Sequence, residues 1–212
     1  MASFERMVKA ALPVICLVVG LTVGVGNAAA DNSHVAVDAR KFVTEVAERT
    51  IQSLTAQNIS KAERRNRFRK LMLEYFAFKG IAKWVLGRYW RRANVRQREE
   101  FLRLFEDLMV VIYADRFAKY SGEKLEVGRS EIRGKNDILV HSLINRSVGL
   151  KPVAVIWRIS HKDENFRIVD LMVEGLSMGL TQQKEFASVI RKNGGKIEGL
   201  LSELRKRLAA NS

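Results

Sequence analysis

The sequence predicts a single α+β domain in which N-terminal and C-terminal helices pack on an antiparallel sheet of about four strands. Apolar residues recur at helical spacing before residue 121 and again after residue 180. Between 125 and 173 they alternate with polar residues, as in strands. No repeat, low-complexity run or linker separates these segments. Helices, then strands, then helices in one unit are typical of an α+β architecture.

The first three helices have recognisable starts and ends. Ser33 can cap a helix whose apolar positions recur to Leu54, and Ser60 with Glu63 forms a capping box for a second helix. We expect a break at 79–80 and a short helix over 81–86. The second helix has a strongly basic face, which is either a solvated surface or a docking site: Lys61, Arg64, Arg65, Arg67, Arg69 and Lys70.

The longest predicted element is a helix over 97–120. Asn94 with Gln97 resembles a capping box, no Gly or Pro interrupts the segment, and Ser121-Gly122 ends it. A helix of about 25 residues would be roughly 37 Å long. One of its faces is apolar, so we expect it to lie along a large apolar surface such as the sheet.

The second half of the chain predicts strands followed by two helices. The strands are expected at 125–133, 138–147, 153–159 and 166–173, and the short turns between them indicate an antiparallel meander. Thr181 can cap a helix that runs to Lys192, and a last helix is expected over 197–208.

The first thirty residues have the three-part layout of a secretory signal peptide. Arg6 and Lys9 precede an apolar run, 10–25, and small residues offer a cleavage site near Ala30. The alternative is a membrane anchor that is not cleaved, but this run is shorter than the roughly 20 residues that span a bilayer. We therefore predict a signal peptide, 1–30, a mature domain, 31–212, and a periplasmic location.

The net charge narrows the class of partner. It is +14, and removal of 1–30 takes away two basic residues and one acidic residue, which leaves +13. Such a charge favours nucleic acid, an acidic protein surface or anionic lipid, and export makes nucleic acid a poor candidate. The only cysteine, Cys16, lies in the signal peptide. The mature domain therefore has neither a disulfide nor a thiolate ligand and must be held together by core packing.

The sequence contains no constellation that supports catalysis, a metal site or a cofactor. His34, His141 and His161 form no metal-binding pair, and there is no nucleophile elbow, phosphate loop or dinucleotide fingerprint. Asp170 and Glu174 could both reach a cleft at a strand end, although structural hydrogen bonding is the simpler role. We expect a binding protein and not an enzyme.

Apolar and aromatic side chains are abundant in the middle of the chain. A long amphipathic helix that faces an antiparallel sheet can leave an apolar cavity between the layers, which suits a ligand that is mostly hydrocarbon. Burial of one acyl methylene gains about 0.8 kcal/mol, so two chains of about fifteen methylenes would gain on the order of 20 kcal/mol before the costs of association.

Two separate motifs resemble the MlaC family of periplasmic phospholipid carriers, also called toluene-tolerance or auxiliary transport proteins. The first is Leu86-Gly87-Arg88-Tyr89-Trp90, followed by Gln97-Arg98-Glu99-Glu100-Phe101 and Tyr120-Ser121-Gly122. The second is Asp170-Leu171-Met172-Val173-Glu174-Gly175-Leu176-Ser177, in which Leu176 replaces the usual Val. The resemblance covers nearly the whole mature chain.

The resemblance implies a soluble shuttle that holds phospholipid acyl chains inside the domain and helps to maintain lipid asymmetry of the outer membrane. Its implied partners are an outer-membrane lipoprotein–porin complex and an inner-membrane ABC transporter with an MCE-domain ring. One branch of the family resembles hopanoid-associated proteins, often called HpnM, and the motifs do not separate the two branches. We expect a monomer.

The main hypothesis is therefore a periplasmic lipid carrier with its pocket between the long helix and the sheet. The predicted wall residues are Trp84, Phe101, Phe105, Met109, Tyr113, Ile144, Val155, Trp157 and Met172. The alternative is a periplasmic module with a filled core that binds an acidic protein surface through Arg64, Arg65 and Arg69 and carries no lipid.

Overall fold

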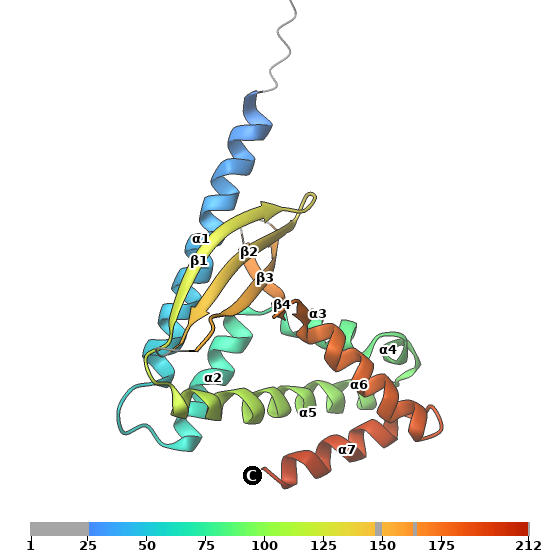
Figure 1. The fold of residues 1–212 in the computed structure, drawn as a ribbon. Helices are drawn as coiled ribbons and strands as arrows, with labels where there is room; N and C mark the ends of the chain where they lie inside the picture. The colour runs from blue at the N-terminus through green and yellow to red at the C-terminus, as the bar shows by residue number, and fades with distance from the viewer. Residues whose placement is uncertain (1–25, 147–149, 163–164, 212) are drawn as a thin grey trace, which may run out of the picture.

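A computed structural model describes residues 26–146, 150–162 and 165–211, with side chains from Ser33 onward, and shows an α+β fold (Figure 1). A long N-terminal helix lies along a five-stranded sheet, and the remaining helices form a second body next to the sheet. The predicted fold class is confirmed. The signal-peptide prediction falls mainly on residues 1–25, and the predicted end of the second strand falls on residue 147, all of which lie outside the described residues.

The helices precede and follow the sheet in the described part of the chain. They are α1 (Gly26–Leu54), α2 (Lys61–Tyr75), α3 (Phe78–Leu86), α4 (Arg88–Arg92), α5 (Val95–Ala114), the 3-10 helix η1 (Asp115–Lys119), α6 (Met178–Lys192) and α7 (Ile197–Ala209). The predicted caps of α2 and α5 are present: the Ser60 hydroxyl accepts from the Glu63 N–H, and Asn94 and Gln97 form a full capping box.

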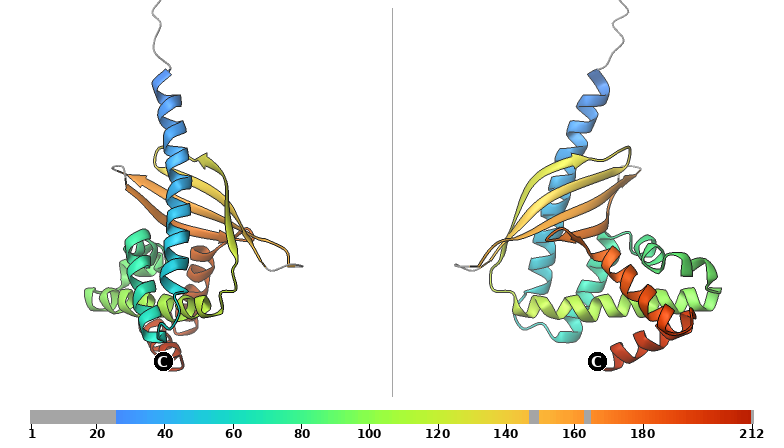
Figure 2. Two further views of the ribbon diagram at one scale, coloured as in Figure 1. Left: turned by 90° about the vertical axis from the view of Figure 1, so that its left-hand side faces the viewer. Right: turned by 45° about the vertical axis from the view of Figure 1, so that its right-hand side comes forward.

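The sheet is an antiparallel meander with the strand order β1-β2-β3-β4-β5. Its strands are β1 (Lys124–Ile132), β2 (Asp137–Asn145), β3 (Val153–Lys162), β4 (Asn165–Val173) and β5 (Leu176–Ser177). Ile138 pairs with Ile159 and Val140 with Trp157, so these side chains share one face. That face packs against α1, which crosses the strands (Figure 2, left), and it is called the α1 face below.

Two separate hydrophobic clusters stabilise the domain. The larger one joins α2, α3, α4, α5, α6 and α7 and includes Phe101, Phe105 and Phe186. The smaller one joins α1 to the sheet through Ala39, Val43, Ile138, Val140 and Ile159. The helical body and the α1–sheet unit therefore each have a core of their own.

The long helix does not lie where the sequence led us to expect it. The α-helix ends at Ala114, and residues 115–119 form the tighter turns of η1. Helix α5 packs mainly against α7 and α2, whereas α1 is the helix that lies along β1 and β2. The apolar face of α5 is covered because α7 presents Leu200, Leu201 and Leu204 to it, all buried.

Two local predictions were also wrong, and one short strand was missed. Lys79 and Gly80 lie inside α3, because a single glycine is tolerated in a helix whose apolar face is buried. Helix α6 begins at Met178, since the Ser177 hydroxyl accepts from the Leu180 N–H before Thr181 is reached. The short strand β5 was not predicted; it pairs with β4 across a two-residue turn.

The basic face of α2 is largely used within the domain. Arg69 binds Glu106 and Asp107 of α5, Arg65 binds Asp115, and the Arg64 guanidinium donates to the Leu54 carbonyl. These contacts tie α2 to α5, η1 and the end of α1. Because Arg64, Arg65 and Arg69 already have partners within the domain, this face is neither a freely solvated surface nor a docking site with unpaired arginines.

Candidate functional site

The α1 face continues beyond the cluster that α1 covers. Ile144 pairs with Val153, Val155 with Val173, and Trp157 with Leu171 across β2, β3 and β4. Strand neighbours in register share a face, so these six side chains form one apolar surface, which we call the sheet patch. Only Val155 is buried, whereas the other five remain partly exposed. The sheet patch is thus an apolar surface that the protein covers incompletely.

A buried hydroxyl fixes the orientation of Trp157 in this patch. The Trp157 Nε1–H donates to Ser142 Oγ at 2.9 Å, and Ser142 Oγ donates to the Val155 carbonyl at 3.0 Å. Ser142 is one of two buried polar residues among the described side chains. Because the indole N–H is satisfied by the protein, the ring can present an apolar surface. The sequence analysis missed Ser142, whose only signal was a polar residue at an inward position of a strand.

The sheet patch reaches the edge of the sheet through a tight turn. Glu174 and Gly175 both have positive φ, and Val173 pairs with Leu176 across them, as in a type I′ hairpin. Glu174 is held in this conformation by β3, because its N–H donates to the Ala154 carbonyl and its carboxylate accepts from the Ala154 N–H. Leu176 thereby continues the apolar surface to an exposed edge.

Three predicted wall residues lie in the sheet patch: Ile144, Val155 and Trp157. Met172 does not, because it pairs with Ile156 and so lies on the opposite face from Val155 and Trp157. Trp84 is also elsewhere: it lies on α3 with 38% of its surface exposed.

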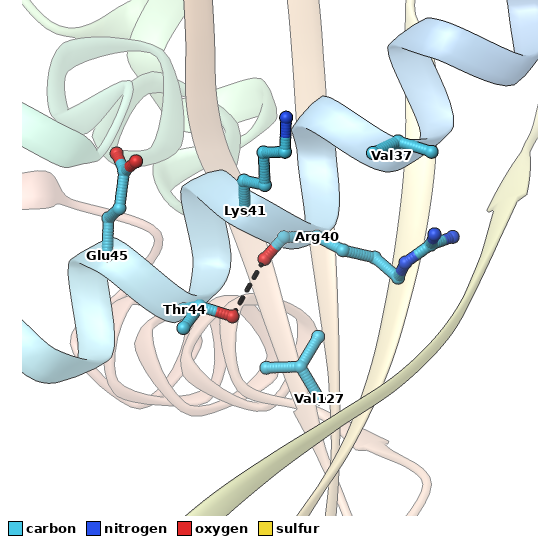
Figure 3. Close-up of a pocket in the computed structure, with 6 residues that line it drawn as sticks. All are labelled: Val37, Arg40, Lys41, Thr44, Glu45 and Val127. Carbon is cyan, nitrogen blue, oxygen red and sulfur yellow. Dashed lines mark hydrogen bonds between the residues drawn. The ribbon is translucent and has the colours of Figure 1, made fainter.

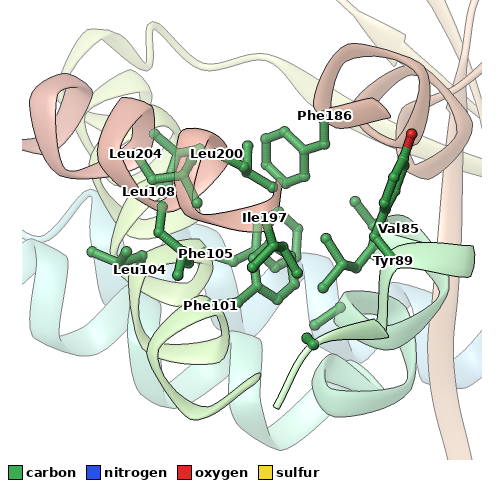
Figure 4. Close-up of a cluster of buried hydrophobic side chains, with 14 of the residues drawn as sticks. Val85, Tyr89, Phe101, Leu104, Phe105, Leu108, Phe186, Ile197, Leu200 and Leu204 are labelled. Atoms are coloured by element: carbon green, nitrogen blue, oxygen red, sulfur yellow. The ribbon is translucent and has the colours of Figure 1, made fainter. Parts of the chain in front are cut away.

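Three other predicted wall residues belong to the helical cluster: Phe101 and Phe105 lie inside it (Figure 4), and Met109 packs against it. Phe101 and Phe105 stack with ring centroids 5.6 Å apart, both lie edge-on to Phe186, and both are buried. Here they act as core residues. A contact between any of these three and a ligand stays a prediction.

Tyr113 lies near the end of α5 and is partly buried. Burial raises the pKa of its hydroxyl, and the nearby Arg116 guanidinium, 5.2 Å from the ring centroid, opposes that shift. The phenol is therefore neutral at physiological pH, which is compatible with an apolar environment. Its contact with a ligand also stays a prediction.

Two open grooves lie on either side of the sheet. One, of about 420 Å³, lies between α1 and β1 and has a mixed polar lining that includes Arg40, Thr44 and Val127 (Figure 3). The other, of about 560 Å³, separates Ile81 and Trp84 of α3 from Asp137 and Arg158 on the face of the sheet opposite α1. Neither groove is lined by the residues of the sheet patch.

Polar residues that could have suggested catalysis have structural partners. Asp170 is buried and accepts from the Ser177 hydroxyl and the Gly179 N–H, so it anchors the start of α6. His141 contacts Glu131, and His161 stacks on Phe166. Within the described residues, no group of three or more His, Cys, Asp or Glu could hold a metal ion.

None of the helices in the described part of the chain combines the length and apolar character needed to cross a bilayer. The fold and the site thus define an α+β domain with an incompletely covered apolar sheet face. The sequence profile described as "MlaC protein" matches residues 44–206. The chain belongs to the MlaC family.

Two relatives illustrate this membership. The intermembrane phospholipid transport system binding protein MlaC of Haemophilus influenzae is 26% identical over 138 residues, which is 64% of this chain and 64% of the relative. The match therefore spans less than two thirds of the relative's length. A solved phospholipid-binding protein of Ralstonia solanacearum, in complex with a phospholipid, superposes with a TM-score of 0.73 over 81% of this chain and 97% of that chain. At 21% identity this second likeness shows a shared fold.

Proposed function

We propose that this protein is a periplasmic lipid carrier that binds phospholipid acyl chains against the sheet patch and shuttles lipid between the outer and inner membranes. The observation that carries the proposal is the incomplete cover of the patch. Apolar side chains on an inward sheet face are normally buried, yet those of Ile144, Val153, Trp157, Leu171 and Val173 keep solvent contact. An apolar ligand would complete their burial.

The energetics favour a ligand with long hydrocarbon chains. Each buried methylene contributes about 0.8 kcal/mol, so even ten methylenes on the patch would contribute about 8 kcal/mol before the cost of association. The patch contains one polar handle, the Trp157 N–H, and that group is already bonded to Ser142. The site therefore offers an acyl chain apolar contact without unpaired polar groups. The charged headgroup would lie at the exposed edge near Leu176.

Family membership and the two relatives support the same function. The Haemophilus relative is named for intermembrane phospholipid transport, and the Ralstonia protein holds a phospholipid. By the same likeness we propose a role in maintaining lipid asymmetry of the outer membrane, with an outer-membrane lipoprotein–porin complex and an inner-membrane MCE-domain transporter as partners. A signal peptide over 1–30, cleaved near Ala30, would deliver the domain, 31–212, to the periplasm.

The first test identifies the bound lipid. The 212-residue sequence is expressed, the exported protein is purified without added lipid, and its mass is measured under native conditions and again after lipid extraction. We expect a stoichiometric phospholipid. A hopanoid would instead place the protein in the hopanoid-associated branch, and a protein free of any lipid would refute the carrier function.

The second test locates the acyl chains. A Trp84→Phe, Trp90→Phe background leaves Trp157 as the only tryptophan of the chain, and the protein is loaded with phospholipid brominated on its acyl chains. Bromine quenches tryptophan fluorescence at short range, so we expect strong quenching of Trp157. The matched control keeps Trp90 alone, which packs against the helical cluster beneath Arg98. Equal quenching of Trp157 and Trp90 would contradict placement on the sheet patch.

A further inference from the structure

Four large apolar side chains are exposed at the edge of the sheet where α6 begins: Leu176 on the α1 face, Met178 and Leu180 on either side of Gly179, and Trp84, which lies against Gly179 from the opposite face. We call them the edge patch: Trp84, Leu176, Met178 and Leu180, each at least 36% exposed, with Leu176 at 68%. Burial of hydrophobic residues is the rule in a stable monomer, and a group of exposed ones marks an interaction surface.

Contacts between α3 and α6 hold this group together. The Trp84 indole lies so close to Gly179 that a side-chain carbon there would be 2.0 Å from Trp84 Cζ3. Gln183 of α6 donates to the Trp84 carbonyl at 2.6 Å. Leu176 pairs with Val173, so the edge patch is continuous with the sheet patch.

Three exposed lysines lie on the segments that form or adjoin this edge. Lys83 is next to Trp84 in sequence, Lys184 lies one helical turn after Leu180, and Lys151 precedes β3 beside the Glu174 turn. None of these three ammonium groups forms an ion pair with the part of the chain that the structure describes. The acidic residues nearby are Glu174, whose carboxylate accepts from the Ala154 N–H, and Glu185, which pairs with Arg207, so the three unpaired lysines outnumber the carboxylate that has no cationic partner.

We propose that the edge patch docks on an anionic bilayer, with its apolar side chains at the level of the headgroups and Lys83, Lys151 and Lys184 on lipid phosphates. Tryptophan and protruding aliphatic side chains favour the membrane interface, and each unpaired lysine adds attraction to anionic lipid. The inference rests on the proposed function, because it gives the sheet patch a place at which lipid enters.

Vesicle co-sedimentation tests the docking. The purified protein is mixed with vesicles of phosphatidylcholine alone or of phosphatidylcholine with phosphatidylglycerol, at low and high salt. We expect binding that requires phosphatidylglycerol and weakens with salt, because the lysine contribution is electrostatic. Equal binding to both kinds of vesicle, or none to either, would overturn the proposal.

Two pairs of variants separate this surface from the rest of the protein. Leu176→Ser with Leu180→Ser should lower the vesicle affinity at least about tenfold. The control, Leu73→Ser with Val95→Ser, changes apolar residues that are 46% and 67% exposed on α2 and α5 and should leave binding unchanged. Charge reversal of Lys83, Lys151 and Lys184 to Glu should abolish the phosphatidylglycerol dependence, whereas reversal of Lys119, Lys192 and Lys206 should not.

Equal vesicle binding by the edge and control variants refutes docking at this patch. Native mass spectrometry of the same samples reports lipid content separately. Vesicle binding by a protein that never carries lipid would refute the carrier function and still support the docking surface. Lipid-loaded protein that does not bind vesicles would refute the docking surface and leave the carrier function intact.

Discussion

Substitution of Gly179 tests how α3 and α6 are joined. A methyl group at this position would lie 2.0 Å from Trp84 Cζ3 and 2.9 Å from Trp84 Cη2. Carbon atoms normally approach no closer than about 3.5 Å, so the indole must shift by more than an ångström. Gly179→Ala should therefore displace Trp84 and destabilise the domain, although alanine is the better helix former.

The expected magnitude is a balance of two effects. Overpacking of this kind costs about 1–3 kcal/mol, and alanine in place of glycine gains up to about 1 kcal/mol in a helix. The net loss of unfolding free energy should be about 1–2 kcal/mol, because the partly exposed indole can move outward. In a Trp84→Ala background the obstacle is gone, and Gly179→Ala should become neutral or stabilising.

Urea unfolding of the four proteins of this double-mutant cycle measures the effect. Gly80→Ala is the matched control, because a methyl group there would meet only Ala77 Cβ, at 4.0 Å. It should stabilise α3 slightly whether or not Trp84 is present. If Gly179→Ala changes stability by the same amount with and without Trp84, the close approach does not determine the packing and the reasoning is refuted.

Three further perturbations test other parts of the structure. Ser142→Ala leaves the partly buried Trp157 N–H without its acceptor, so urea unfolding should show a loss of about 0.5–1.5 kcal/mol; an unchanged midpoint would contradict this role. Arg69→Ala removes partly exposed ion pairs to Glu106 and Asp107, and its cost of about 0.5–1 kcal/mol should shrink in high salt. Hydrogen bonds from the Ser121 N–H, within Glu123 itself and from the Ser121 hydroxyl lower the pKa of Glu123 below its ordinary 4.5. Ionised Glu123 therefore contributes to the free energy of unfolding above pH 4.5, and this contribution is lost as the pH falls below 4.5. Glu123→Gln should lessen acid destabilisation in that range and no other.

Periodicity predicted the kind and order of most elements, because local spacing determines them. Each of the four longer strands was predicted, to within a few residues, from alternation and turn residues. The capping pairs Ser60–Glu63 and Asn94–Gln97 also located two helix starts, since a cap needs only residues three apart. These signals depend on neighbours along the chain.

The partner of each apolar face could not be predicted in the same way. Phe101 and Phe105 on α5 look like pocket walls in the sequence, yet Phe186 and the leucines of α7, about one hundred residues further on, cover them. Strand alternation would have excluded Met172 from the face of Trp157 once the register was known. Ile144, Val155 and Trp157 share the sheet patch because alternation along a strand places them on its inward face, which a local pattern predicts; their contact with a ligand stays a prediction.

The motif over residues 170–179, which helped to indicate the family, acts as a structural joint. Asp170 on β4 binds the start of α6, and Glu174 and Gly175 form the tight turn that returns β5 to the sheet. Gly179 then admits Trp84 of α3 against α6. One short segment thus ties the sheet to two helices of the helical body, which otherwise has a separate core. Because Val173 and Leu176 bring the apolar surface to this joint, the same residues that connect the two cores also determine the shape of the edge at which we place lipid entry.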